Sequence, residues 1–175
     1  MSGNHIFLIG FMGTGKTTIA SCFGKKNSME MVEMDEIIEK REGKSVFDIF
    51  LENGEEYFRD LETEVLKELC VQDNKIVSCG GGVVLRKENV SVMKRSGTIV
   101  LLTASPQEIF ERVKNDNKRP LLAGVGNVEA IKELMNERKA RYEEAADITV
   151  YTDGKSVGEI SEELIGELKR AKERE

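Results

Sequence analysis

The stretch Gly10-Phe11-Met12-Gly13-Thr14-Gly15-Lys16-Thr17 decides how the rest of the chain is interpreted. It fits the pattern G-x-x-x-x-G-K-[ST] in full. It follows the apolar run 6–9, which predicts a buried strand, and it opens a segment that predicts a helix over about 16–25. A glycine-rich loop between a strand and a helix is the context that confirms a phosphate-binding loop, or P-loop.

The residue types in this loop match what phosphate binding requires. Glycines let backbone N–H groups turn toward phosphate oxygens, and the N-terminus of the following helix adds partial positive charge. The Lys16 ammonium can reach the β- and γ-phosphates of a nucleotide, and the Thr17 hydroxyl can bind Mg²⁺. The sequence therefore predicts a nucleotide-binding site at residues 10–17.

The segments around this loop predict an α/β fold. Short apolar runs that predict further strands occur over 29–34, 75–78, 98–102 and 148–151. Helical patterns separate them, and two have clear start signals at Ser105-Pro106-Gln107-Glu108 and Ser156-Val157-Gly158-Glu159. Apolar strands separated by helices indicate a parallel sheet covered on both faces. We therefore expect a P-loop NTPase-type three-layer sandwich with a five-stranded parallel sheet.

The length of the chain and the absence of linkers predict one domain that carries a helical insertion and a lid loop. The 175 residues contain no repeat and no low-complexity linker, so we expect a single domain over 1–175. Residues about 35–70 hold two helical patterns, one beginning near Ser45 and one over 55–69, and this is more chain than one crossover helix needs. We expect a small helical substrate-binding insertion there. The polar, glycine-rich stretch 115–126 predicts a lid loop over about 113–125.

Composition excludes several classes of protein. The 26 basic and 32 acidic residues give a net charge of −6, which argues against a broad grip on nucleic acid. No apolar run reaches the roughly 20 residues that cross a bilayer, and no secretory signal is visible. Three cysteines without C-x-x-C spacing and a single histidine, His5, give no support to a disulfide framework, a zinc site or a Ser-His-Asp triad. We expect a cytoplasmic monomer that binds small molecules, with no nucleic-acid or membrane partner.

Two acidic residues mark the end of the second predicted strand. Glu33 and Asp35 lie one residue apart, so on a strand they would point the same way, beside the P-loop. One could hold Mg²⁺ through water while the other orients an acceptor hydroxyl. A solvated strand end in an acidic protein is the alternative explanation of this pair.

Two helices carry arginines that could bind an anion. Arg59 has acids at i−4 and i+3, Glu55 and Glu62, which is the usual pattern of a surface ion pair. Arg138 falls on the apolar stripe of its helix, where burial without an anionic partner would be costly. Arg141 lies near the same stripe, so spacing alone does not choose between these two arginines.

Glycines and a second cation suggest further contacts with ligands. Gly80, Gly81 and Gly82 end the third predicted strand after Cys79, and three glycines in succession favour close approach of backbone amides to a ligand over a plain wide turn. For Cys79, a small buried apolar side chain is the favoured interpretation. Arg119, with Lys118 as its rival, would place a cation on the lid near the transferred phosphate.

These motifs resemble one known family across nearly the whole chain. The P-loop, the acidic pair, Phe58-Arg59, Gly80-Gly81-Gly82, Arg119-Pro120-Leu121-Leu122 and an arginine in the penultimate helix occur in the order found in shikimate kinases. The P-loop is shared with many kinases, whereas the combination is far more specific. The resemblance implies ATP-dependent phosphorylation of the shikimate 3-hydroxyl, giving shikimate 3-phosphate and ADP in aromatic amino-acid biosynthesis.

The resemblance also implies a role for each matching residue. Lys16, Asp35 and Arg119 would be catalytic. ATP, the co-substrate, would be bound by Gly13, Thr14, Gly15, Lys16, Thr17, Thr18, Arg112 and Arg119. Shikimate would be bound by Asp35, Arg59, Gly80, Gly81, Gly82 and Arg138, with the two arginines on its carboxylate. Thr17 and Glu33 would serve Mg²⁺, and Ser78 matches a hydroxyl near the water shell of the metal.

One departure from the family pattern affects the metal site, and two other functions remain open. The family usually has Asp-x-Asp after the second strand, whereas this chain has Glu33 first, so its longer side chain could shift a water-mediated Mg²⁺ contact. A P-loop kinase for gluconate or a nucleoside monophosphate is one alternative function. A catalytically weak relative that binds ligand for regulation is the other, although Lys16, Thr17, Asp35 and Arg119 are all intact.

Overall fold

The computed structural model describes residues 4–114 and 127–174. In these ranges the strands are β1 (His5–Ile9), β2 (Glu30–Glu33), β3 (Lys75–Ser78), β4 (Gly97–Thr103) and β5 (Ile148–Tyr151). The α-helices are α1 (Lys16–Asn27), α2 (Met34–Glu42), α3 (Val46–Leu69), α4 (Lys87–Ser96), α5 (Pro106–Val113), α6 (Val128–Ala145) and α7 (Val157–Lys172), and a 3₁₀ turn, η1, covers Val83–Leu85. The two helix start signals are confirmed, because Ser105 and Ser156 both cap their helices through the side chain.

The strands form one parallel sheet in the order β2-β3-β1-β4-β5. On the central strand, Phe7 lies beside Val77 of β3 and Ile99 of β4. Because all strands run the same way, the carboxyl ends of β1, β2 and β3 meet at one edge of the sheet, where open α/β sheets bind ligands. The predicted five-stranded parallel α/β fold is confirmed.

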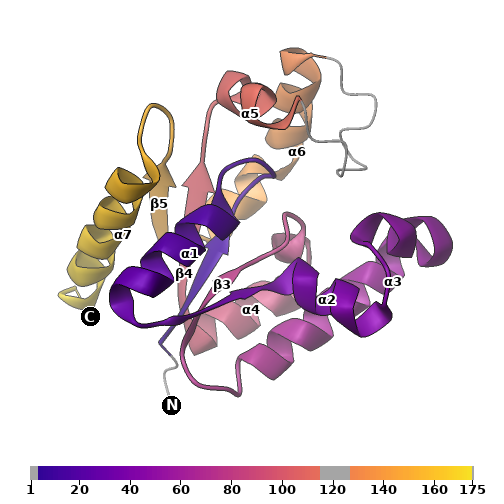
Figure 1. Cartoon of the computed structure of the whole chain (residues 1–175), viewed down its shortest axis with the longest axis horizontal. Helices are drawn as coiled ribbons and strands as arrows, with labels where there is room; N and C mark the ends of the chain where they lie inside the picture. Colours follow the sequence, from indigo (N-terminus) through magenta and orange to yellow (C-terminus); the bar gives the residue numbers. More distant parts are fainter. Residues whose placement is uncertain (1–3, 115–126, 175) are drawn as a thin grey trace.

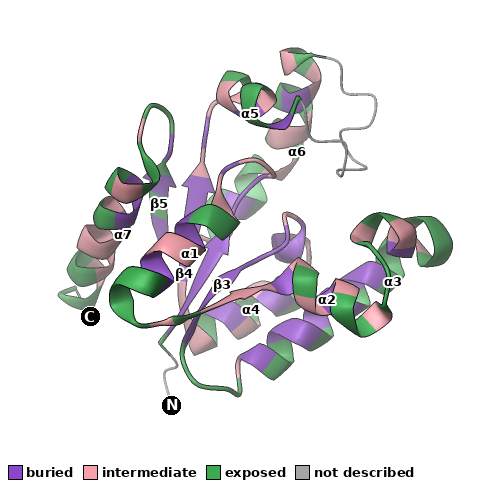
Figure 2. Cartoon of the chain, in the orientation of Figure 1, coloured by how far each residue is buried: buried purple, intermediate pink, exposed green. Residues whose placement is uncertain are grey.

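Helices cover both faces of the sheet, and each face has its own core (Figures 1 and 2). On one face Leu8 and Val100 pack with Phe23 of α1 and Leu164 of α7. The core of the opposite face joins sheet residues to α2, α3, α4 and α6, and its fully buried members include Phe7, Val77, Ile99, Ile38, Leu66 and Met93. Because both faces of the sheet are covered, successive residues of a strand are all buried, which explains why the strands are continuous apolar runs in the sequence. No helix in the described ranges is both long and apolar enough to span a membrane.

The region after β2 differs from the expectation in one respect. The strand ends at Glu33, and α2 begins at once with Met34, so Asp35 lies in the first turn of a helix and not on the strand. The expectation that Glu33 and Asp35 point the same way from one strand is therefore wrong. The side chain of Glu33 makes no capping hydrogen bond to α2, which explains why the sequence carries no clear start signal for this helix.

The two helical patterns of the insertion appear as one kinked element. Ser45 caps α3 by accepting a hydrogen bond from the Asp48 N–H. Gly54 interrupts the helix with φ 85° and ψ 170°, a backbone conformation that is almost restricted to glycine. The two segments therefore begin close to the predicted positions, and Figure 1 shows the first of them beyond the end of α2, away from the sheet.

Candidate functional site

The P-loop connects β1 to α1 in a conformation that only glycines adopt easily. Gly13 has φ 79° and Gly15, which precedes the first residue of α1, has φ 91°. The Thr14 hydroxyl is buried and donates to the Phe11 carbonyl at 2.8 Å, so this side chain holds the loop together from inside. The Lys16 Nζ donates to the carbonyls of Gly10 and Phe11 at 2.9 and 3.1 Å, which keeps the ammonium over the loop.

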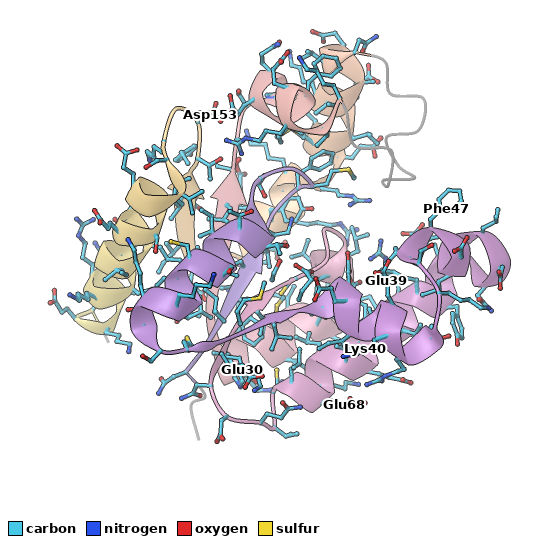
Figure 3. All side chains as sticks on the ribbon, viewed as in Figure 1. Glu30, Glu39, Lys40, Phe47, Glu68 and Asp153 are labelled. Carbon is cyan, nitrogen blue, oxygen red and sulfur yellow. The ribbon has the colours of Figure 1, made fainter. Side chains whose placement is uncertain are left out.

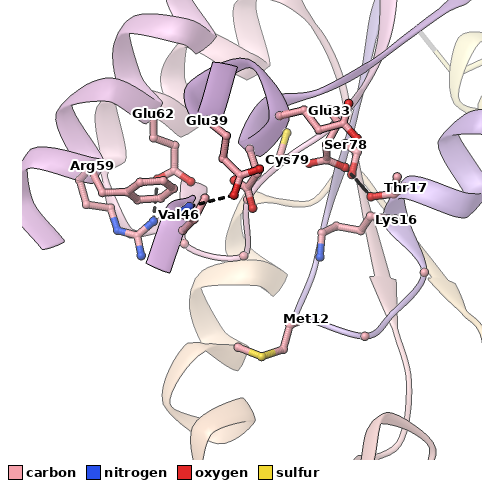
Figure 4. A pocket seen from close by; sticks show the side chains of 18 of the residues that line it. Met12, Lys16, Thr17, Glu33, Glu39, Val46, Arg59, Glu62, Ser78 and Cys79 are labelled. Carbon is pink, nitrogen blue, oxygen red and sulfur yellow. Dashed lines mark hydrogen bonds and ion pairs between the residues drawn. The ribbon is translucent and has the colours of Figure 1, made fainter. Parts of the chain in front are cut away.

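Three oxygen-bearing side chains meet at the start of α1. The Thr17 hydroxyl donates to the Glu33 carboxylate and lies 3.2 Å from the Ser78 hydroxyl. Thr17 belongs to α1, whereas Glu33 and Ser78 are the last residues of β2 and β3. Glu33 and Ser78 are register partners in the parallel pair, so they lie side by side. Figure 4 shows the group together at one end of a pocket, next to Lys16. The longer side chain of Glu33 thus reaches the P-loop threonine directly.

Two carboxyl groups converge on the glycine turn after β3. A Cβ placed on Gly80 would lie 2.5 Å from Glu62 Oε1 and 3.0 Å from Asp35 Oδ1, so only glycine leaves room for both. These two oxygens are buried and find no hydrogen-bond partner among the described residues. Burial, reinforced by the charges of Glu33 and Glu62, raises the pKa of Asp35 from 3.8 to about 7. Burial likewise raises the pKa of Glu62 above its ordinary value, against the opposing charge of Arg59.

Arg59 pairs with both acids that its spacing predicts, but it is buried and not on the surface. Its side chain contacts Glu62 at 2.8 Å and Glu55 at 3.2 Å, and the residue is only 6% exposed. The guanidinium lies 5.3 Å from the ring centroid of Phe58. A Cβ on Gly82 would lie 2.2 Å from it, which means that the cation is seated directly against the glycine turn. The interpretation of Arg59 as an ordinary surface ion pair is wrong.

The structure separates the two arginines of α6. Arg138 lines the pocket, and its Nη1 lies 3.5 Å from the Gly81 carbonyl. Arg141 is exposed and donates to the Leu85 carbonyl at 2.9 Å, outside the pocket. Arg138 is therefore the one that can meet a ligand.

These groups line a single cavity of about 660 Å³. Its P-loop side carries Gly13, Gly15, Lys16, Thr17 and Thr18, and the far side carries Asp35, Arg59, Gly80, Gly81, Gly82 and Arg138. In Figure 4 Lys16 and Thr17 lie at one end, and Arg59 and Glu62 at the other. The cavity can therefore hold a phosphorylated donor and an anionic acceptor side by side, although nothing in its shape alone names the acceptor.

One predicted ATP contact, Arg112, lies away from the cavity. Arg112 is outside the cavity lining; it donates to the Gly13 carbonyl and the Thr152 hydroxyl, each at 3.2 Å, and so lies behind the P-loop, next to the loop that follows β5. In that loop Asp153, labelled in Figure 3, accepts the Ser105 N–H. Arg119 and all of the predicted lid after Lys114 fall outside the described residues, and Val113, where the lid was expected to begin, is the last residue of α5.

Sequence reasoning gave no role in the site to several acidic and aromatic residues of the cavity, namely Glu36, Glu39, Phe50, Phe58 and Glu62. Glu39 accepts the Val46 N–H at 2.8 Å and so ties α2 to the start of α3. The contact between Glu39 and Val46 could not be predicted, because helix α2 itself was not predicted. Glu62 was noted only as an ion-pair partner, since its i+3 spacing from Arg59 carries no sign of burial. Cys79 is 1% exposed, which confirms its interpretation as a buried apolar side chain, and it also lines the cavity.

Comparisons with known proteins agree with this geometry. A family model described as "Shikimate kinase" matches residues 12–169. A protein named shikimate kinase from Dehalococcoides mccartyi is 42% identical over 167 residues, which cover 95% of this chain and 94% of that protein. The structure of "Shikimate kinase from Acinetobacter baumannii in complex with shikimate" is similar with a TM-score of 0.91 at 28% identity, covering 96% of this chain and 94% of that one.

A more distant likeness shows how far the fold alone extends. A gluconokinase from Sinorhizobium meliloti superimposes with a TM-score of 0.60 at 16% identity, over 98% of this chain and 94% of that one. At that identity the likeness concerns the fold alone and gives no support to gluconate as the acceptor. Because the family model covers most of the chain and the Dehalococcoides relative matches nearly end to end, the chain belongs to the shikimate kinase family of ATP-dependent phosphotransferases.

Proposed function

We propose that the chain carries out its shikimate kinase activity with ATP on the P-loop side of the cavity and shikimate on the α3 side. The observation that carries this assignment is that one cavity is lined both by Lys16 and Thr17 and by Asp35, Arg59 and Arg138. The helical insertion over about 35–70 would then be the substrate-binding part of the single domain.

The shikimate carboxylate is assigned to the two arginines. Arg59 and Arg138 approach the turn of Gly80, Gly81 and Gly82 from α3 and α6, and a planar guanidinium suits a carboxylate better than any other side chain. The turn itself leaves backbone at the surface of the cavity for the ring of the substrate.

Asp35 is assigned to the attacking hydroxyl. A carboxyl with a pKa of about 7 is ionised in about half of the molecules at neutral pH, and its carboxylate form is a stronger base than that of an ordinary aspartate. The hydroxyl oxygen forms a bond to the γ-phosphorus of ATP, the bond from that phosphorus to the β–γ bridging oxygen breaks, and the hydroxyl proton passes to Asp35. Since phosphoryl transfer depends mainly on positioning and charge stabilisation, Lys16 and the P-loop amides would supply most of the remaining rate.

The residues at the start of α1 fit Mg²⁺. Thr17, Glu33 and Ser78 present only oxygen atoms, the ligand type that this ion prefers. No group of three or more His, Cys, Asp or Glu side chains arranged for a metal occurs in the described ranges, and Mg²⁺ in kinases is typically held by one or two protein oxygens together with substrate phosphates. When bound, the ion would neutralise charge on the transferred phosphate. Thr17 would hold it directly and Glu33 would orient the Thr17 hydroxyl.

Other assignments rest on the resemblance and composition. Arg119 would act near the transferred phosphate, and Arg112 would support the ATP side from behind the P-loop. The chain is expected to be a cytoplasmic monomer. Light scattering after gel filtration tests the expected oligomeric state.

A coupled assay of ADP release tests the acceptor. Shikimate should support turnover, whereas quinate, gluconate and CMP should not. Turnover with gluconate or CMP alone would contradict the proposed acceptor, and ADP release with none of the four would favour a binding protein without catalysis.

Variants of the two arginines test the carboxylate assignment. Arg138→Ala should raise the KM for shikimate by about 10- to 100-fold, because a charge-assisted contact in a desolvated site is lost, while the KM for ATP stays within about threefold. At the other position Arg59→Lys is the informative change, since Arg59→Ala would leave the buried Glu62 without its partner and lower stability as well. The matched control is Arg141→Ala, which removes an exposed guanidinium one turn further along the same helix. A raised KM for ATP alone would contradict the assignment.

A further inference from the structure

Tyr142 is a buried polar residue that the proposed chemistry leaves without a role. It lies on α6, is 5% exposed, and is the only one of the three tyrosines that is buried. Its hydroxyl donates a hydrogen bond to the Gly81 carbonyl, which belongs to the glycine turn of the cavity. A tyrosine hydroxyl is not needed to fill a core, so this bond requires an explanation beyond packing.

Arg138 and Tyr142 act on the same point of the turn. They are four residues apart on α6 and therefore share a face of the helix. A Cβ placed on Gly81 would lie 3.7 Å from the Tyr142 hydroxyl and 3.8 Å from Arg138 Nη1. Burial raises the pKa of Tyr142, and the positive charge of nearby Arg138 opposes that rise. The Tyr142 hydroxyl and the Arg138 guanidinium therefore share one acceptor, the Gly81 carbonyl.

The far end of this segment is fixed by other side chains. Arg86 follows η1 and binds Asp60 and Glu56 of α3, and Arg141 of α6 donates to the Leu85 carbonyl. These contacts hold residues 85 and 86, at the far end of the segment. At the cavity itself, the Gly81 carbonyl is held by α6 alone among the described contacts, through Tyr142 and, more loosely at 3.5 Å, Arg138.

We propose that Tyr142 is a positioning residue of the acceptor site, which orients the Arg138 guanidinium toward the cavity and fixes the Gly81 backbone against which the acceptor rests. This inference depends on the proposed placement of shikimate beside Arg138. Tyr142 itself does not line the cavity, so it acts through these two neighbours and makes no contact with the substrate.

The variant Tyr142→Phe removes one oxygen and keeps the ring. The KM for shikimate should rise by about 5- to 20-fold, with kcat within about threefold and the KM for ATP unchanged, because the loss concerns ground-state placement of the acceptor. In an Arg138→Ala background the same change should raise the KM by a smaller factor, because one of the two groups that Tyr142 holds is already gone. Tyr57→Phe, which removes an exposed hydroxyl bonded to Glu42, should leave all three constants unchanged.

A spectroscopic measurement tests the inference on the natural chain. The protein has three tyrosines and no tryptophan, so a near-ultraviolet difference spectrum on adding shikimate reports tyrosines directly. We expect a tyrosine difference signal that persists in Tyr57→Phe and is lost in Tyr142→Phe.

The outcomes separate this inference from the proposed function. An unchanged KM for shikimate in Arg138→Ala would overturn the carboxylate assignment itself. A raised KM in Arg138→Ala, with an unchanged KM in Tyr142→Phe or an equal rise from Tyr142→Phe in both backgrounds, would overturn only the positioning role. Absence of a tyrosine signal in the natural chain would also overturn it.

Discussion

At the scale of single residues, the burial of Asp35 lowers the stability of the folded protein at neutral and higher pH. Asp35 is placed beside Glu33, Glu62 and Glu39, and only Lys16 offers it an opposing charge among the groups that shift its pKa. Ionising this carboxyl in the folded protein costs free energy, so the folded state loses stability at a pH where the same group in the unfolded chain is ionised.

The variant Asp35→Asn should therefore be inactive but more stable. The folded pKa of about 7 lies above the ordinary value of 3.8, so the unfolded chain releases this proton first, and stability falls as the pH rises between the two values. At pH 8 the variant should exceed the natural chain in free energy of unfolding by about 1–3 kcal/mol, and the gain should shrink toward pH 4.5. Its kcat should fall by about 10²- to 10⁴-fold.

Urea unfolding at the two pH values measures this difference, with Asp73→Asn as an exposed control expected within about 0.5 kcal/mol of the natural chain. A variant that is less stable at pH 8 would show that the Asp35 carboxylate is favourably solvated in the folded protein, contrary to its burial.

How far the sequence predicts these residues depends on the signal each one carries. The glycines, Lys16 and Thr17 are determined by a motif whose chemistry is local. Arg59 and its two acids follow from helical spacing, yet spacing is the same for a buried and an exposed pair, so the burial of Arg59 was not foreseen. The partner of Tyr142 lies 61 residues away, and no local pattern encodes such a contact.

At the scale of elements, caps and apolar runs were predictable and α2 was not. The last three strands have apolar runs, and the helices that begin after Ser45, Ser105 and Ser156 have side-chain caps, whereas β2 is short and not fully buried. Helix α2 lacks a side-chain cap and follows a strand without any turn, so its first residues read as a continuation of that strand. The consequence reaches the site, because Asp35 owes its position to the first turn of α2.

The kink in α3 gives a test at this scale. Gly54 has φ 85° and ψ 170°, and a Cβ there would meet nothing within 4 Å, so any penalty for Gly54→Ala comes from the backbone alone. We expect a loss of about 1–3 kcal/mol in free energy of unfolding. Gly166 lies inside α7, and its Cβ position is equally open, so Gly166→Ala should instead stabilise by about 0.5–1 kcal/mol. Equal effects of the two changes in denaturant unfolding would contradict the kink.

At the scale of the whole molecule, the net charge describes the surface and not the cavity. The chain carries −6, yet both substrates of this family are anions. Among the described residues that line the cavity, Lys16, Arg59 and Arg138 lie beside five acids, so the cations are outnumbered there and their individual positions matter more than the sum of charges. Composition alone could exclude a broad basic surface, but it could not reveal this local arrangement.

The insertion is part of the same core as the sheet, which decides how the molecule should unfold. Ile38 of α2 and Phe58 and Leu66 of α3 belong to one buried cluster with Phe7 and Val77 of the sheet. A segment that shares its buried surface with the central strands cannot lose its structure alone without exposing that surface. Residues about 35–70 are therefore expected to unfold together with the sheet and not as a separate unit.

We expect a single cooperative transition for the whole chain, in which far-ultraviolet circular dichroism and tyrosine fluorescence give the same urea midpoint. Tyr57 lies in the insertion and Tyr142 and Tyr151 lie outside it, so single-tyrosine variants report the two regions separately. Shikimate at about 100 times its Kd should raise the free energy of unfolding by about 2.7 kcal/mol for both reporters alike. An earlier transition seen only through Tyr57, or a shikimate effect confined to that reporter, would show that the insertion unfolds independently and that its packing against β1 and β3 contributes little to the stability of the molecule.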